Sequence, residues 1–144
     1  MNTILVLEDD AIVMNVFRGV LEASNYRVLS STNAEEALAW SGSRPTIDLL
    51  IADVALPVSS GVAVALQLRQ RIPALKIILT SGYPPDIWGP RHRAELDQIP
   101  SDAVRILSKP FLPKELLAMV SALVGTAPDS GVAEFAGSSQ VKRR

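Results

Sequence analysis

The stretch ILVLEDDAIV, residues 4–13, carries four aliphatic residues straight into three carboxylates. The aliphatic run predicts a short strand that is buried on both faces, as in a parallel sheet covered by helices on each side. Glu8, Asp9 and Asp10 follow where that strand should end. Like charges at this spacing repel one another unless a proton or a cation relieves them. The stretch therefore predicts a buried parallel strand with a polar site at its end.

Similar aliphatic runs recur along the chain and alternate with segments of helical character. The predicted strands are residues 3–7, 26–30, 48–52, 76–80 and 103–107. The predicted helices are residues 11–23, 33–41, 60–71, about 91–97 and 113–124. This alternation predicts an α/β fold, a doubly wound and mainly parallel sheet with helices on both faces. Such sheets carry their sites at the carboxyl ends of the strands.

Local signals also predict helix boundaries and buried faces. Asp10 is the expected N-cap of the first helix, and Thr32 or Asn33 is that of the second. Pro113 is expected in the first turn of the last helix. The 3.6-residue spacing in the first helix predicts a buried face formed by Val13, Val16, Phe17, Val20 and Leu21.

Length and composition fit one globular domain. The chain has 144 residues and a net charge of −1, so nothing suggests a nucleic-acid partner. It has no cysteine, which excludes disulfides and thiolate chemistry. It shows neither a signal peptide nor an apolar run of about 20 residues, so we expect a cytoplasmic protein without membrane contact. Residues 1–124 are predicted to form the domain, and residues 125–144, rich in Gly, Ala and Ser, a flexible tail.

Polar residues end three more of the predicted strands. Asp53 follows the run LLIA, Thr80 ends IILT, and Lys109 follows RILS. The carboxyl ends of parallel strands lie along one edge, so these residues should converge with Glu8 and Asp9. Clustered carboxylate oxygens suit Mg²⁺, while a hydroxyl and an ammonium group suit a bound phosphoryl group. The residues alone thus predict a phosphoryl-transfer site that works by positioning and charge neutralisation.

Four motifs in order, ILVLEDD, LLIADVALP, IILTSG and LSKPF, resemble the receiver domain of two-component response regulators. The resemblance covers residues 3 to about 124, and the separation of Asp9 from Asp53 also fits. It implies a flavodoxin-like sheet of five strands in the order 2-1-3-4-5. It also implies a phosphoaspartate switch of a two-component or phosphorelay system, which promotes its own phosphorylation and dephosphorylation. We expect a stand-alone receiver, and Met1 close to the first strand favours a complete chain.

The resemblance assigns a role to each acidic residue. Asp53 would accept the phosphoryl group from a sensor histidine kinase or a phosphotransfer protein. Asp9 and Asp53 would bind Mg²⁺ directly, and Glu8 would act mainly through a bound water. The backbone carbonyl of Ala55 would be a further magnesium ligand.

The resemblance also assigns roles to the remaining polar residues. Thr80 would bond a phosphoryl oxygen, and Lys109 would pair with the phosphoryl charge. The Lys109–Pro110 peptide would be cis, a form that X-Pro bonds adopt at modest cost. An output protein, of unknown identity, would bind the face formed by the fourth helix, the fifth strand and the fifth helix.

The chain departs from the family pattern on its predicted fifth strand and in the segment before its fourth helix. At the position of the aromatic ring that the family couples to the threonine, this chain has Ile106. Tyr83 is a candidate substitute. The path from Thr80 to Lys109 is longer than in compact receivers and contains SGYPPDIWGP, in which Trp88 is expected to be exposed. The segment TSGYP also resembles receivers attached to, or partnered with, hybrid sensor kinases.

Two other functions fit parts of the pattern. A haloacid-dehalogenase-type phosphatase also uses an aspartate nucleophile and Mg²⁺. That family needs a second acid two residues after the nucleophile, but two residues after Asp9 this chain has Ala11. A degenerate receiver could act unphosphorylated as a docking module, and Ile106 keeps this alternative open. His92, the sole histidine, is expected to be exposed and not a metal ligand.

Overall fold

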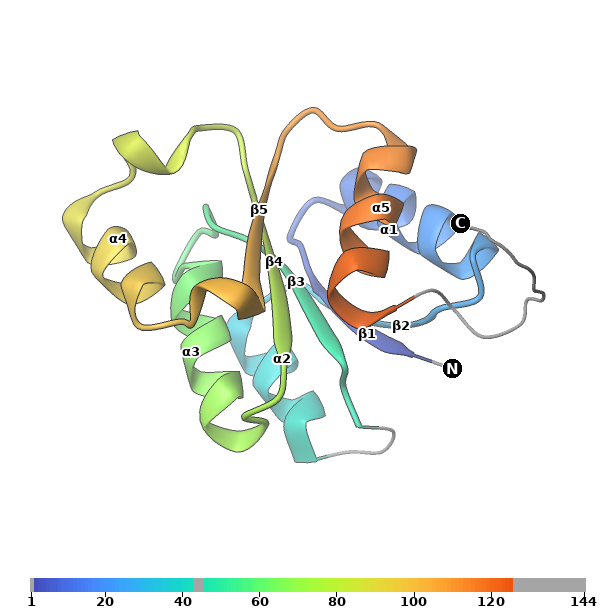
Figure 1. The fold of residues 1–144 in the computed structure, drawn as a ribbon, viewed down its shortest axis with the longest axis horizontal. Coiled ribbons are helices and arrows are strands. Elements are labelled where there is room, and N and C mark those ends of the chain that lie inside the picture. Colours follow the sequence, from blue (N-terminus) through green and yellow to red (C-terminus); the bar gives the residue numbers. More distant parts are fainter. Residues whose placement is uncertain (1, 43–45, 126–144) are drawn as a thin grey trace.

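The computed structural model describes residues 2–42 and 46–125, which form one five-stranded sheet flanked by helices (Figure 1). The strands are β1 (Thr3–Leu7), β2 (Arg27–Ser31), β3 (Leu49–Asp53), β4 (Lys76–Ser81) and β5 (Val104–Ser108). The helices are α1 (Ala11–Ala23), α2 (Ala34–Ala39), α3 (Gly61–Arg71), α4 (Pro90–Asp97) and α5 (Pro113–Val124), with 3₁₀ turns η1 (Trp40–Gly42), η2 (Pro85–Ile87) and η3 (Ser101–Ala103). All strands are parallel, in the order β2-β1-β3-β4-β5. The predicted fold class and strand order are confirmed.

Burial of the strands follows their place in the sheet. Every residue of β1 and β3 is buried, as the continuous aliphatic runs predicted. The outer strands β2 and β5 are partly exposed, because each has a neighbouring strand on one side only. The most buried strands are therefore those that lead to the predicted acidic residues.

Helices cover both faces of the sheet, and each layer has its own apolar core. α1 and α5 lie on one face, and α2, α3 and α4 lie on the other (Figure 1). The first core includes Ile4, Val6, Phe17, Leu21, Leu49, Ile51, Leu116 and Val120. The second core includes Leu5, Leu7, Ala37, Leu50, Val62, Val64, Leu68 and Leu79. Alternate residues of β1 and β3 enter opposite cores, as the two-residue period of a strand requires.

The buried stripe of α1 differs from the predicted one at its edge. Phe17 and Leu21 are buried, and Val13 and Val20 are packed against the same core. Met14 is also buried, but the side chain of Val16 is 47% exposed, so the prediction for Val16 was wrong. These two residues flank the stripe on opposite sides of the helix, and spacing alone cannot decide which side meets the sheet.

Helix termini carry the predicted caps. The Asp10 carboxylate accepts hydrogen bonds from the backbone N–H groups of Ile12 and Val13 at 2.8 and 3.2 Å, which confirms it as the N-cap of α1. Asn33 caps α2 by accepting from the Glu36 N–H at 2.9 Å. Pro113 is the first residue of α5, as predicted.

Strand register brings the polar strand ends to one edge. In the β3–β4 ladder Asp53 stands opposite Thr80, and in the β4–β5 ladder Ser81 stands opposite Ser108. The backbone N–H of Lys109 continues the second ladder by donating to the Ser81 carbonyl at 2.8 Å. Parallel pairing therefore places residues from three separate stretches side by side.

The predicted tail begins at Gly125, and its residues 126–144 lie outside the described residues. Among the residues that the structure describes, no helix combines the length and the apolar character needed to cross a bilayer.

Candidate functional site

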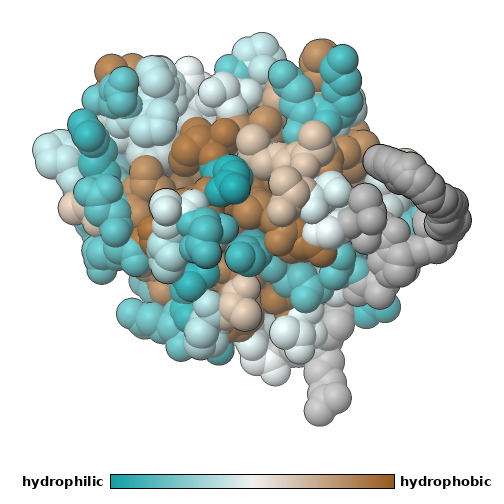
Figure 2. Space-filling model, in the orientation of Figure 1, coloured by the Kyte–Doolittle hydropathy of each residue, from teal (hydrophilic) through white to brown (hydrophobic). Residues whose placement is uncertain are grey.

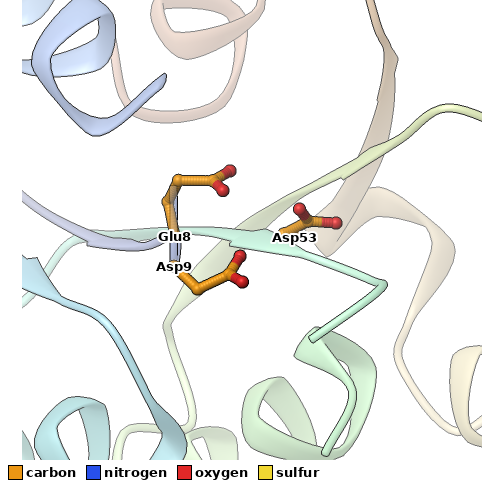
Figure 3. A group of neighbouring side chains, drawn as sticks. All are labelled: Glu8, Asp9 and Asp53. Atoms are coloured by element: carbon orange, nitrogen blue, oxygen red, sulfur yellow. The ribbon is translucent and has the colours of Figure 1, made fainter. Parts of the chain in front are cut away.

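Three carboxylates come together at the carboxyl edge of the sheet. Glu8 and Asp9 directly follow β1, Asp53 ends β3, and the three side chains lie close to one another (Figure 3). One oxygen from each lies within 4.8 Å of those of the other two. Glu8 and Asp53 are buried, whereas Asp9 is exposed. Water and ions can therefore reach the cluster from the Asp9 side.

Lys109 is the cation of the site. Its Nζ lies 2.8 Å from Asp53 Oδ2 and 3.4 Å from Glu8 Oε1. The Lys109–Pro110 peptide bond is cis, as predicted. Among the described residues, one ammonium group thus contacts two members of a cluster of three carboxylates, which leaves an excess of negative charge at the edge of the sheet.

The pKa values of two groups follow from this arrangement. Burial raises the pKa of Glu8 above its ordinary value of 4.5, although the Asp10 N–H and the Lys109 ammonium oppose this effect. Burial alone would lower the pKa of Lys109, but the hydrogen bond and charge of Asp53, together with those of Glu8, outweigh it and raise that pKa above 10.5. Lys109 therefore stays charged at neutral pH, while a negative charge on Glu8 is disfavoured.

The carboxylate of Asp53 is held at both oxygens. Oδ1 accepts a hydrogen bond from the Ala55 backbone N–H at 2.9 Å, and Oδ2 accepts one from Lys109. Thr80 stands opposite Asp53 in the ladder and is buried, and its carbonyl accepts from the Val54 N–H at 3.0 Å. All residues predicted for the site therefore lie at this edge, and Asp53 is the group that the others surround.

Asp10 stands apart from the other two acids of the opening stretch. Its side chain accepts from the first turn of α1, and its backbone N–H donates to Glu8 Oε2 at 3.1 Å. The three consecutive carboxylates thus divide into two members of the edge cluster and one helix cap.

The donor atoms of the cluster fit a magnesium ion. Mg²⁺ prefers hard oxygen ligands, takes few of them from protein and keeps several waters. Both oxygens of Glu8 and of Asp53 already accept hydrogen bonds. Among the described residues, Asp9 has no such partner and is exposed. Asp9 is therefore the most available ligand, and the engaged Glu8 suits the predicted role through a water molecule.

Sequence reasoning missed a hydrogen-bonded cluster in the loop after β4. Trp88 was expected to be exposed but is buried, with 7% of its surface accessible. Its indole N–H points to two acceptors, Ser81 Oγ and the Tyr83 carbonyl, each at 3.3 Å. The Tyr83 side chain is exposed. No periodicity or motif could have revealed these contacts, because they depend on the turn that the loop makes.

His92 also differs from its prediction, because it is half-buried. It lines a hollow of about 400 Å³ together with Arg91 on α4 and with the loop between β3 and α3. The hollow borders the site at Val54 and Ala55, but His92 does not belong to the group of potential metal ligands that the structure identifies among its described residues.

The strand order is that of the flavodoxin-like class of doubly wound sheets, with polar groups at the edge where such folds bind ligands. A family model described as the response regulator receiver domain matches residues 4–121. The chain therefore belongs to the response regulator receiver domain family.

Three relatives illustrate the range of this family. The chain is 30% identical over 124 residues to the transcriptional regulatory protein ResD of Bacillus subtilis, covering 86% of this chain but 48% of ResD. It is 30% identical over 125 residues to the sensor kinase CckA of Brucella abortus, covering 85% of this chain and 12% of CckA. A crystal structure of the response regulator TrrA of Thermotoga maritima, in complex with Mg²⁺ and BeF, superposes with a TM-score of 0.68 and 31% identity, covering 85% of this chain and 99% of that one. The chain thus spans about half of one relative and a small part of another.

Proposed function

We propose that the chain is a phosphoaspartate signalling switch, with Asp53 as the phosphoryl acceptor and Mg²⁺ as cofactor. The observation that carries this proposal is the position of the Asp53 carboxylate, 2.8 Å from Lys109 Nζ and within 4.8 Å of the Glu8 and Asp9 oxygens. An anionic acceptor needs neighbouring positive charge to meet a negatively charged phosphoryl group. The ammonium group of Lys109 and a cation bound by the carboxylate cluster would supply this positive charge.

The residues of the chain would share the transfer among themselves. A carboxylate oxygen of Asp53 attacks the phosphorus of a phosphohistidine, the P–N bond breaks, and the released nitrogen keeps the electron pair and later takes a proton from water. Lys109 moves its ammonium toward the charge of the arriving phosphoryl oxygens, and the Thr80 hydroxyl donates to one of them. Asp9 and Asp53, with the Ala55 carbonyl and with Glu8 through water, would hold Mg²⁺, which supplies charge neutralisation for the phosphoryl oxygens.

The phosphoryl donor would be a sensor histidine kinase or a phosphotransfer protein. Membership of the receiver family supports this donor class. The similarity to one segment of a sensor kinase and to one half of a transcriptional regulator indicates that related domains occur in both settings. For this chain we favour a cytoplasmic receiver, formed by residues 1–124, that signals by binding a separate protein.

The output partner would bind the face formed by α4, β5 and α5. Apolar side chains gather in the middle of this face, where β5 runs between the two helices (Figure 2). A hollow of about 610 Å³ lies between the end of α4 and β5, and its lining combines Leu96, Ile99, Pro100, Val104 and Ile106 with the polar Asp97, Gln98 and Ser101. An apolar hollow with a polar surround is a typical protein-binding surface.

Phosphorylation of the chain by a small phosphodonor tests the proposal. The protein is incubated with Mg²⁺ and acetyl phosphate, and its intact mass is measured beside that of Asp53→Asn. We expect a base-labile adduct of about 80 Da, one phosphoryl group, on the wild type only. No adduct and no binding of beryllofluoride would overturn the proposal and favour a docking module that acts unphosphorylated. Continuous turnover of phosphate esters would favour a phosphatase.

A further inference from the structure

Ser81 connects the two residues that would hold the phosphoryl group. It follows Thr80 directly in β4. Its carbonyl accepts the backbone N–H of Lys109 at 2.8 Å. Ser81 itself is buried, so a change in its position is passed to Thr80 through the chain and to Lys109 through this hydrogen bond.

The side chain of Ser81 is in turn held by the loop that follows. Its hydroxyl donates to the Tyr83 carbonyl at 2.8 Å and accepts from the Tyr83 N–H at 3.0 Å. The indole N–H of Trp88 reaches the same hydroxyl and the same carbonyl, each at 3.3 Å. Two residues of a proline-rich loop therefore fix one serine at the edge of the sheet.

Trp88 anchors this arrangement in the interior. Its ring belongs to the apolar core on the α2, α3 and α4 side of the sheet, which also includes Leu79 and Ile99. Ile106 packs against the same core. Because Gly89, the N-cap of α4, follows Trp88 immediately, movement of the indole would also move the start of α4.

We propose that Ser81 and Trp88 act together as positioning residues for phosphoryl transfer and couple the occupied site to α4. The proposal rests on the phosphoaspartate function proposed above. It assigns to Trp88 the connection between site and surface that Ile106, which has no polar side-chain atom, cannot make. Tyr83 contributes through its backbone, since its side chain is 60% exposed.

The other tryptophan supplies a matched control. Trp40, the C-cap of α2, donates its indole N–H to the Ser30 carbonyl at 3.1 Å and is partly buried against the same core. The chain contains two tryptophans, so Trp40→Phe leaves Trp88 as the single indole fluorophore. Trp88→Phe removes one N–H group and keeps an apolar ring, and Trp40→Phe makes the same chemical change elsewhere.

Phosphorylation by acetyl phosphate is measured for the wild type, Ser81→Ala, Trp88→Phe, the double variant and Trp40→Phe, with Mg²⁺ affinity measured by calorimetry. A lost neutral hydrogen bond corresponds to a change of about 2- to 10-fold. We expect slowing of this size in each single variant, no further slowing in the double variant, and Mg²⁺ affinity within about 2-fold of the wild type. Beryllofluoride with Mg²⁺ should change the fluorescence of Trp40→Phe but not that of Trp88→Phe.

The outcomes separate the two proposals. If the wild type forms the adduct and both single variants match its rate, the positioning role is overturned and the switch stands. Equal losses of rate and of Mg²⁺ affinity would show general structural damage and would also overturn the positioning role. A wild type that forms no adduct and binds no beryllofluoride overturns the switch, and the role of the pair with it.

Discussion

The interior of the sheet and its carboxyl edge are built from the same strands but follow opposite rules. In the interior, β1 and β3 bury aliphatic side chains almost without interruption. One position further along, Glu8 and Asp53 are buried as acids, and one lysine serves both. Apolar burial stabilises a fold, whereas burial of like charges costs stability. The comparison indicates that apolar burial in the interior stabilises the fold by more than the burial of the acids at the edge destabilises it.

The largest expected effect is a loss of stability in the interior. Leu50 is fully buried and stands between Leu5 and Ile77 in the neighbouring strands. Leu50→Ala should lower the free energy of unfolding by about 2–5 kcal/mol, because it removes apolar contacts and leaves a cavity. Urea unfolding followed by circular dichroism measures the change. A loss below about 1 kcal/mol would show that the interior is not the main source of stability.

A smaller effect is expected where the edge meets α3. A Cβ atom at Gly61 would overlap the Asp53 carbonyl oxygen and would lie 2.9 Å from the Cβ of Ala52. Gly61→Ala should therefore cost about 1–3 kcal/mol through overpacking and should also slow phosphorylation, because the end of β3 must shift. Gly19→Ala, at a position where a Cβ meets nothing within 4 Å, is the control. Unchanged unfolding and phosphorylation in Gly61→Ala would contradict the close approach.

Substitutions of the neighbouring residues Asp9 and Asp10 should affect different properties, Mg²⁺ affinity in the first case and stability in the second. Asp10→Ala should lower the free energy of unfolding by about 1 kcal/mol through loss of the α1 cap and should leave Mg²⁺ affinity unchanged. Asp9→Ala should instead weaken Mg²⁺ binding by at least about tenfold with little change in stability. Calorimetric titration and thermal unfolding of both variants measure the two effects. The reverse pattern would contradict the division of the three acids.

The smallest effect is a gain in stability. Burial raises the pKa of Glu8 in the folded state, so the ionised form destabilises the fold at any pH above that raised value. Glu8→Gln should therefore stabilise the metal-free protein slightly at neutral pH. The gain should shrink as the pH falls through the raised pKa of Glu8. It should vanish below the ordinary pKa of 4.5, where Glu8 is protonated in both the folded and the unfolded protein. Urea unfolding at several pH values tests the sign, and a loss of stability at neutral pH would refute it.

Much of the fold could be predicted because the local sequence patterns agree with the tertiary structure. Continuous aliphatic runs marked the central strands, and Asp10 and Pro113 marked helix starts. The gathering of Glu8, Asp53 and Lys109 followed from one rule, that parallel strands end at the same edge. These predictions needed only chain order and side-chain type.

The loop after β4 could not be predicted, for a physical reason. SGYPPDIWGP has the composition of an exposed loop. Its tryptophan is nevertheless buried in a core whose other residues are mostly distant in sequence. Ser81 looked like an ordinary strand residue, and its bonds to Tyr83 and Trp88 depend on a turn that no periodic pattern encodes. On α1, the choice between Met14 and Val16 depended on how the helix is rotated against the sheet.

The sheet also acts as a partition. Its two apolar cores share the strands but have no side chain in common among the described buried residues. A substitution under α1 and α5 therefore removes side-chain contacts from one core only, although both layers end at the same acidic edge. The proposed output face takes α4 from one layer and α5 from the other, so a substitution in either core affects one helix of that face directly and the other only through the shared strands.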